Sequence, residues 1–71
     1  MIARVALIGF GEVGQTLAKD LAKAGIAHIG AWDVKFTDSA SIPSRALAGH
    51  SVRAAAGAAD AVAGAELVIS A

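Results

Sequence analysis

The sequence predicts an α/β fold in which a parallel sheet carries helices on its flanks, as in the first half of a doubly wound domain. Short apolar segments of strand length alternate along the chain with segments of helical period. This alternation is typical of parallel sheets with right-handed crossovers. Three closely spaced glycines join the first apolar segment to the first helical one. We therefore expect the strands in the spatial order third, second, first, fourth.

Four segments are expected to form the strands. The first is a nearly continuous apolar run that ends at Gly9, as expected for a strand buried on both faces. The last has three consecutive apolar residues, from Leu67 to Ile69. The predicted strands are Ala3–Ile8, Ile26–Trp32, Ser51–Ala54 and Glu66–Ala71.

Glu12–Ala24 has the period of an amphipathic helix. Its apolar side chains recur at i, i+4 and i+8, with alanines beside them, and are expected to pack on the sheet. These residues are Val13, Leu17, Leu21, Ala18 and Ala22. The polar residues expected to point away are Gln15, Lys19, Asp20 and Lys23. Gly25 is placed to end the helix in the left-handed conformation.

Two shorter helices are expected in the second half of the chain. Pro43 suits a first helical position, so a short helix is predicted over Ser44–Ala48 and should end at Gly49. The alanine-rich segment Gly57–Ala63 is predicted to form one or two helical turns. The remaining stretch, Thr37–Ser44, is polar and turn-like.

The bulk composition excludes several classes of function. Acidic and basic residues cancel, so the formal net charge is zero and nucleic acid is not an expected partner. The chain has no cysteine, which excludes disulfides and thiolate metal sites and fits a reducing cytoplasm. No secretory signal is recognisable. No apolar stretch reaches the roughly 18 residues that span a membrane, so no membrane association is expected.

The glycines Gly9, Gly11 and Gly14 have the spacing G-x-G-x-x-G between a predicted strand and a predicted helix. Gly9 allows a tight turn, Gly11 lets a pyrophosphate approach the backbone, and Gly14 lets helix and strand pack closely. The amides around Gly11–Val13 are free at the helix start and suit an anion. The expected cofactor-binding residues of this loop are Gly9, Phe10, Gly11, Glu12, Val13 and Gly14.

Asp33 supplies a second, independent signal for a dinucleotide. It follows Gly14 by 19 residues at the predicted end of the second strand, where dinucleotide-binding folds carry an acidic residue for the adenosine ribose hydroxyls. A carboxylate here suits the 2′-hydroxyl of NAD and repels the 2′-phosphate of NADP. The cofactor is therefore NAD or NADP, with NAD favoured, although Lys35 or Arg45 could partly compensate. Phe36 could border the adenine or could simply pack.

The two histidines do not indicate a metal site. Neither His28 nor His50 has a second ligand at metal-binding spacing.

Three segments, "IGFGEVG" (Ile8–Gly14), "LAKDLAKAG" (Leu17–Gly25) and "AADAVAGAELVISA" (Ala58–Ala71), carry a family resemblance. Together they resemble the amino-terminal NAD(P)-binding Rossmann domain of the phosphogluconate dehydrogenase and hydroxyisobutyrate dehydrogenase superfamily. The resemblance implies an oxidoreductase that transfers a hydride between a nicotinamide and a small hydroxy acid. It also places Ser70 and Ala71 near the cofactor. Many members have Asn-Arg after the second strand, whereas this chain has Asp33-Val34-Lys35.

The same resemblance implies that residues 1–71 are a partial domain, truncated after the fourth strand. Members of that family are several times longer, and their catalytic residues come from later segments. We therefore expect no catalytic residue in this chain and no activity from it alone. The expected partners are the dinucleotide and the missing carboxy-terminal domain of a parent enzyme, itself expected to be a homo-oligomer.

Two other classes of nucleotide-binding protein share part of this pattern. Regulatory dinucleotide-sensing domains of potassium transport have the glycine turn and the strand-end aspartate. They usually have a Gly-Asp-containing turn after the third strand, which "SVRAAAGAAD" lacks. A methyltransferase would not need the third glycine, Gly14. These differences favour the dehydrogenase.

Overall fold

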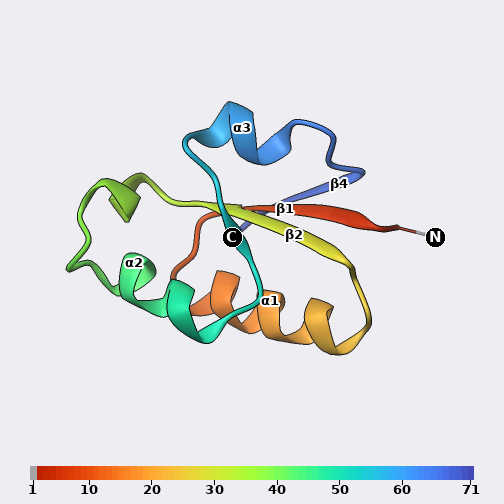
Figure 1. Cartoon of the computed structure of the whole chain (residues 1–71), viewed down its shortest axis with the longest axis horizontal. Helices are drawn as coiled ribbons and strands as arrows, with labels where there is room; N and C mark the ends of the chain where they lie inside the picture. Colours follow the sequence, from red (N-terminus) through yellow and green to blue (C-terminus); the bar gives the residue numbers. More distant parts are fainter. Residues whose placement is uncertain (1) are drawn as a thin grey trace.

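The computed structural model describes residues 2–71 and contains a four-stranded parallel sheet (Figure 1). The strands lie in the order β3-β2-β1-β4, and every neighbouring pair is parallel. This confirms the predicted α/β class and the predicted strand order. The strands are β1 (Arg4–Ile8), β2 (His28–Trp32), β3 (Arg53–Ala54) and β4 (Leu67–Ser70).

Helices lie on both faces of the sheet. Figure 1 shows α1 (Glu12–Lys23) below the strands and α3 (Ala58–Val62) above them. The connection from β2 to β3 lies beyond the carboxyl ends of β1 and β2. It contains the 3-10 helix η1 (Val34–Thr37), the helix α2 (Ile42–Ala46) and the 3-10 helix η2 (Leu47–Gly49).

Helix α1 ends as its sequence predicts. Gly25 has a φ of 90°, which is the left-handed conformation that glycine adopts without strain. The Gly25 N–H donates to Ala22 and the Ile26 N–H donates to Leu21, which is the Schellman arrangement. Because Ile26 belongs to this helix ending, strand β2 begins later than predicted, at His28.

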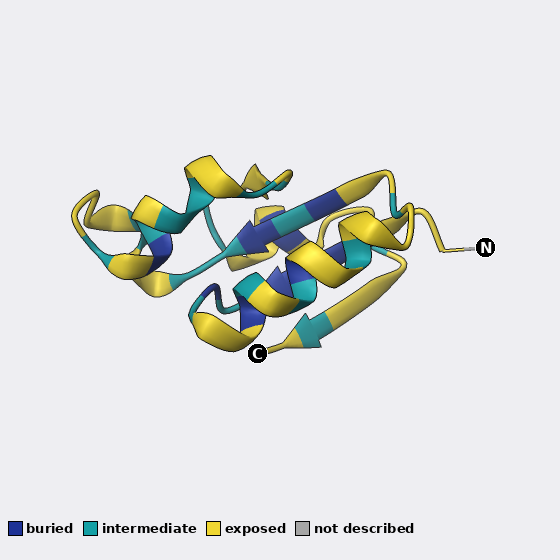
Figure 2. Ribbon diagram, turned by 90° about the horizontal axis from the view of Figure 1, so that it is seen from below, coloured by how far each residue is buried: buried dark blue, intermediate teal, exposed yellow. Residues whose placement is uncertain are grey.

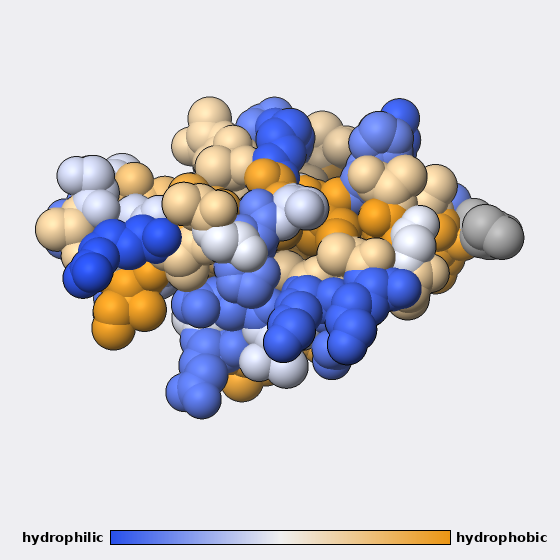
Figure 3. Space-filling model, turned by 60° about the horizontal axis from the view of Figure 1, so that its bottom comes forward, coloured by the Kyte–Doolittle hydropathy of each residue, from blue (hydrophilic) through white to orange (hydrophobic). Residues whose placement is uncertain are grey.

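The packing face of α1 differs from the prediction. Gly14 and Ala18 are its buried residues, and Leu17 and Leu21 are half-buried beside them. Val13 is 63% exposed, and Ala22 is exposed as well. At Gly14 the helix lies against the carbonyl group of Gly9, and Val13, one residue away around the axis, faces outward. Figure 3 shows hydrophilic side chains gathered over the outer surface of α1, as expected for its lysines.

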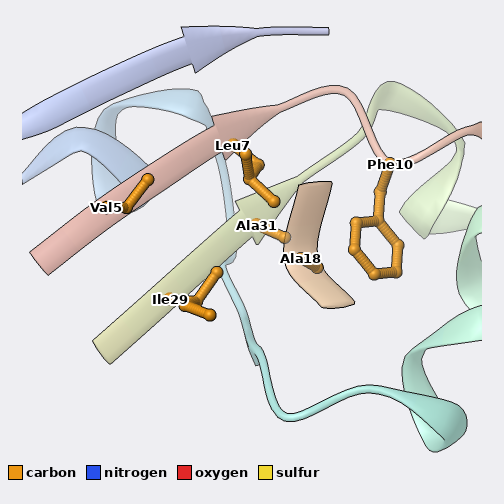
Figure 4. Close-up of a cluster of buried hydrophobic side chains, with 6 residues drawn as sticks. All are labelled: Val5, Leu7, Phe10, Ala18, Ile29 and Ala31. Carbon is orange, nitrogen blue, oxygen red and sulfur yellow. The ribbon is translucent and has the colours of Figure 1, made fainter. Parts of the chain in front are cut away.

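The core lies between the sheet and α1. It is a small cluster in which Phe10 and Leu7 are the largest fully buried side chains. Figure 4 shows the ring of Phe10 beyond the strand ends, next to side chains from β1, β2 and α1. Figure 2 shows that most of β4 and the outer sides of the helices are exposed. The buried cluster comprises Val5, Leu7, Phe10, Ala18, Ile29 and Ala31.

The β2–β3 connection is more ordered than its polar sequence predicts. Asp33 caps η1 by accepting a hydrogen bond from the Lys35 N–H. Ser41 caps α2 by accepting one from the Ser44 N–H, with Pro43 in the first turn. The short helix therefore spans Ile42–Ala46 rather than Ser44–Ala48, because the serine cap sets its start ahead of the proline.

Candidate functional site

Two glycines of the loop after β1 are explained by the fold itself. Gly9 has a φ of 107°, and a Cβ there would overlap the carbonyl oxygen of Ala71. A Cβ on Gly14 would overlap the carbonyl oxygen of Gly9. Gly9 therefore allows the turn and the approach of the segment after β4. Gly14 allows α1 to lie against that turn, as its sequence position predicts.

Gly11 is different, because neither conformation nor packing within the described residues requires a glycine there. Its φ is −76° and its ψ is −158°, which other residues adopt. A Cβ built on Gly11 has no atom within 4 Å. The missing side chain thus leaves open space at the start of α1, where a ligand can approach the backbone.

The amino end of α1 presents free amides at this open position. No side chain caps Gly11. The first intrahelical bond runs from the Gln15 N–H to the Gly11 carbonyl at 2.9 Å, and residues 2–71 provide no acceptor for the four preceding amides. Free amides and the positive end of the helix dipole together favour an anion. The exposed carboxylate of Glu12, in the first turn, opposes this preference.

A cleft of about 430 Å³ lies next to these amides. It joins the glycine loop and first turn of α1 to the end of β2 and the start of α2. The lining residues are Gly11, Glu12, Gln15, Asp33, Lys35, Ile42 and Pro43. Four of the residues predicted to bind a cofactor therefore meet in one cleft, namely Gly11, Glu12, Asp33 and Lys35.

Asp33 lies in this cleft at the carboxyl end of β2, as predicted, and its carboxylate also supports the backbone around it. One oxygen, Oδ2, accepts a hydrogen bond of 2.8 Å from the Phe10 N–H. The other, Oδ1, accepts one of 2.9 Å from the Lys35 N–H. Asp33 thus ties the glycine loop to η1. Each carboxylate oxygen keeps a further lone pair for a ligand.

The side chain of Phe10, a residue predicted to contact the cofactor, belongs to the core. Its side chain is fully buried, and its amide is bonded to Asp33. Its ring packs edge to face against Phe36, with the ring centroids 6.1 Å apart. The sequence left two roles open for Phe36, bordering the adenine or packing. In the structure its ring packs against Phe10. The large apolar side chain between two glycines fixes the loop to the core, a contact that spacing along the chain does not reveal.

Val13 and Ser70 lie outside the lining of the cleft. Val13 is exposed on the first turn of α1. Ser70 is exposed at the carboxyl end of β4, where it pairs with Ile8. The next residue, Ala71, donates its N–H to the Ile8 carbonyl at 2.8 Å and lies against Gly9. The end of β4 therefore meets the glycine turn.

Sequence reasoning missed three residues of the cleft, Gln15, Ile42 and Pro43. Gln15 belongs to the predicted polar face of α1, yet it is half-buried, and its Nε2 donates to the Phe10 carbonyl at 3.1 Å. Ile42 is 73% exposed, and its large apolar side chain lines the cleft. The connection's fold brings α2 to the cleft, and no local pattern indicates that.

A second cleft, of about 240 Å³, lies toward the amino ends of β1 and β2 beside α3. Its polar lining includes Arg4, His28 and Arg53. In residues 2–71, no three histidine, aspartate or glutamate side chains group closely enough to hold a metal ion. None of the helices in that part of the chain is long and apolar enough to cross a membrane.

A parallel α/β sheet, a glycine turn, an uncapped helix start and a strand-end carboxylate at one cleft define the class of Rossmann-like dinucleotide-binding domains. The comparison with family models agrees: residues 4–71 match the family described as NADP oxidoreductase, coenzyme F420-dependent, and the chain belongs to this family. It is an NAD(P)-binding domain of an oxidoreductase family. No match was found among curated proteins or among solved structures.

Proposed function

We propose that this chain is the cofactor-binding part of an NAD(P)-dependent dehydrogenase that acts on a small hydroxy acid. The resemblance to the phosphogluconate and hydroxyisobutyrate dehydrogenases supports this finer assignment within the NAD(P)-binding family. The observation that carries the binding role is Gly11, which is open, conformationally unstrained and next to free helix amides.

The residues of the cleft fit the parts of a dinucleotide. The amides of Gly11, Glu12 and Val13 suit the pyrophosphate, since they form the uncapped start of α1. The Asp33 carboxylate suits the ribose hydroxyls as a hydrogen-bond acceptor. The bound nicotinamide supplies the hydride chemistry. This chain binds and orients the cofactor, and we assign no catalytic residue within it.

We further propose a preference for NAD over NADP. Asp33 and Lys35 line the same cleft with opposite charges. The Asp33 carboxylate is held in place by two backbone amides, whereas Lys35 is exposed. A fixed negative charge beside the ribose disfavours a 2′-phosphate more than a mobile ammonium favours it.

The binding role is tested by replacing Gly11 with valine in the full-length protein. Gly11→Val is expected to abolish most NAD(P) affinity with little change in circular dichroism, because the side chain enters open space. Gly57→Val is the matched control. Gly57 also precedes a helix, α3, without a capping side chain, and a Cβ built on it has no atom within 4 Å. Unchanged cofactor affinity in Gly11→Val would contradict the assigned site.

The cofactor preference is tested with Asp33→Ser and Asp33→Asn. Both remove the negative charge, and asparagine keeps an oxygen acceptor for one of the two amides. We expect the ratio of NADP to NAD affinity to rise about tenfold, which corresponds to ~1.4 kcal/mol. Asp38→Asn is the control, since Asp38 accepts from Ala40 in the same connection and lies outside the cleft lining. A parent protein that already prefers NADP strongly would overturn this proposal and favour Lys35 or Arg45 as the determinant.

A further inference from the structure

The residue between the first two glycines, Phe10, is held at three separate points. Its N–H donates to Asp33, and its carbonyl accepts a hydrogen bond from Gln15. Its ring is fully buried and packs edge to face against Phe36 and His50, with centroid distances of 6.1 and 5.5 Å (Figure 4 shows the ring among the buried side chains). These contacts within the chain therefore fix the shape of the loop.

The contact from Gln15 sets the direction of an amide in the cleft. A trans peptide group is planar, so the Gly11 N–H points opposite to the Phe10 carbonyl oxygen. No described residue has a cis peptide bond. The side-chain Nε2 of Gln15 holds that oxygen at 3.1 Å. The Gly11 N–H is one of the free amides at the start of α1 and lies at the cleft.

Gln15 also bonds to the other side of the same residue. Its own backbone N–H donates to the Gly11 carbonyl at 2.9 Å. One residue thus restrains the peptide groups on both sides of Gly11, the position where the chain is open to a ligand. The Gln15 side chain is half-buried and lines the cleft, so it is shielded partly from competing water.

We propose that Gln15 is a positioning residue for the dinucleotide, orienting the Gly11 amide toward the pyrophosphate before the cofactor binds. This inference rests on the proposed cofactor site. The side chain acts through the Phe10–Gly11 peptide group and needs no contact with the ligand. Its contribution is preorganisation, because a loop already in its binding shape loses less entropy when a ligand arrives.

The test is Gln15→Met in the full-length protein, a variant of similar length that lacks the donor. One hydrogen bond of net worth near 1 kcal/mol corresponds to an affinity change of about fivefold. We expect the dissociation constants of NAD and ADP to rise by about this factor, whereas that of adenosine, which lacks the phosphates, stays unchanged. Thr16→Val is the control, because Thr16 bonds only to the Glu12 carbonyl of its own helix.

Several results would overturn the inference. Wild-type affinity for ADP in Gln15→Met would show that the contact does not orient the site. Equal losses for ADP and adenosine would indicate general loosening of the fold rather than orientation of one amide. If Gln15→Met does not fold, Gln15→Leu, which removes the donor and adds no charge to the cleft, gives the same comparison. An unmodified protein that binds neither NAD nor NADP would instead refute the proposed function, and this inference with it.

Discussion

The three glycines of the loop have two different roles. Two of them let other backbone atoms come close, and the third leaves space for a ligand. Gly9 and Gly14 make room for other backbone atoms, namely Ala71 and Gly9 itself. A Cβ built on Gly11 would have no atom of the described chain within 4 Å. Asp33 belongs to both groups, because it holds the Phe10 amide and also lines the cleft. Substitutions at these positions should therefore separate stability from ligand binding.

Gly14→Ala is expected to destabilise the protein, because the new methyl group would overlap the Gly9 carbonyl oxygen and push α1 off the sheet. Overpacking of this kind costs roughly 1–3 kcal/mol. The measurement is urea unfolding. Gly49→Ala is the control, since a Cβ there meets no atom within 4 Å. Equal stability of the two variants would show that the close approach at Gly14 is absent in solution.

Glu12→Gln is expected to tighten NAD(P) binding by about two- to fivefold at low salt. The exposed Glu12 carboxylate lies in the first turn of α1 and lines the cleft, so it repels a pyrophosphate there. The gain should shrink at high salt because exposed charges are screened.

The same change should cost about 0.3–1 kcal/mol of stability, since Glu12 complements the helix dipole. Asp20→Asn, on the exposed side of α1, is the control for charge alone.

At the scale of elements, one side-chain contact joins β3 to α3. The Arg53 guanidinium donates to the Asp60 carboxylate at 2.9 Å and to the Asp60 carbonyl at 3.1 Å. The same carboxylate oxygen accepts the Ala56 N–H at 3.0 Å. The hydrogen bond from Ala56, then the bond from Arg53, lowers the pKa of Asp60 below its ordinary value of 3.8. The contact closes the short connection between the two elements.

Because the folded pKa of Asp60 is lowered, its ionised form stabilises the fold above pH 3.8, and this contribution disappears as pH falls through the lowered pKa. Asp60→Asn is therefore expected to be less stable than the parent at pH 7 and to approach the parent's stability in acid. Denaturant unfolding between pH 7 and pH 2 measures the difference. A gap that is constant over this range would show that charge at Asp60 has no part in it. Asp20→Asn is the matched exposed control.

At the scale of the whole molecule, the core and the cleft share residues. Phe10 is one of the two largest fully buried side chains, and its amide and carbonyl shape the loop at the cleft. The core is small and rich in alanine, so little apolar surface stabilises each element. A ligand in the cleft should accordingly stabilise the fold as a whole.

Saturation with a bound dinucleotide is expected to raise the melting temperature of the full-length protein. Binding to the folded state alone adds about 2.7 kcal/mol when the ligand is at 100 times its dissociation constant. Thermal melts with increasing NAD measure the effect, which should be absent in Gly11→Val and present in Gly57→Val. A melting temperature independent of NAD and NADP in the parent would contradict a dinucleotide site.

The sequence by itself determined the parts of this protein that depend on local order along the chain. Apolar runs and the helical period predicted the parallel sheet and its order, and Gly25 predicted the end of α1. The spacing of Gly11 and Asp33 placed both at one cleft, because the carboxyl ends of neighbouring parallel strands meet at one edge of the sheet.

Only the tertiary structure decided which side chains serve the core and which serve the cleft. Val13 fits the helical stripe, yet it is exposed, whereas its neighbour Gly14 is buried against the carbonyl group of Gly9. Gln15 fits the polar face, yet it bonds to Phe10, and Phe10 itself is buried between two glycines. Periodicity describes a helix in isolation, whereas burial depends on where the helix axis crosses the strand ends. At Gly14 the placement of the helix depends on a contact with the backbone of Gly9, which the helical period does not indicate.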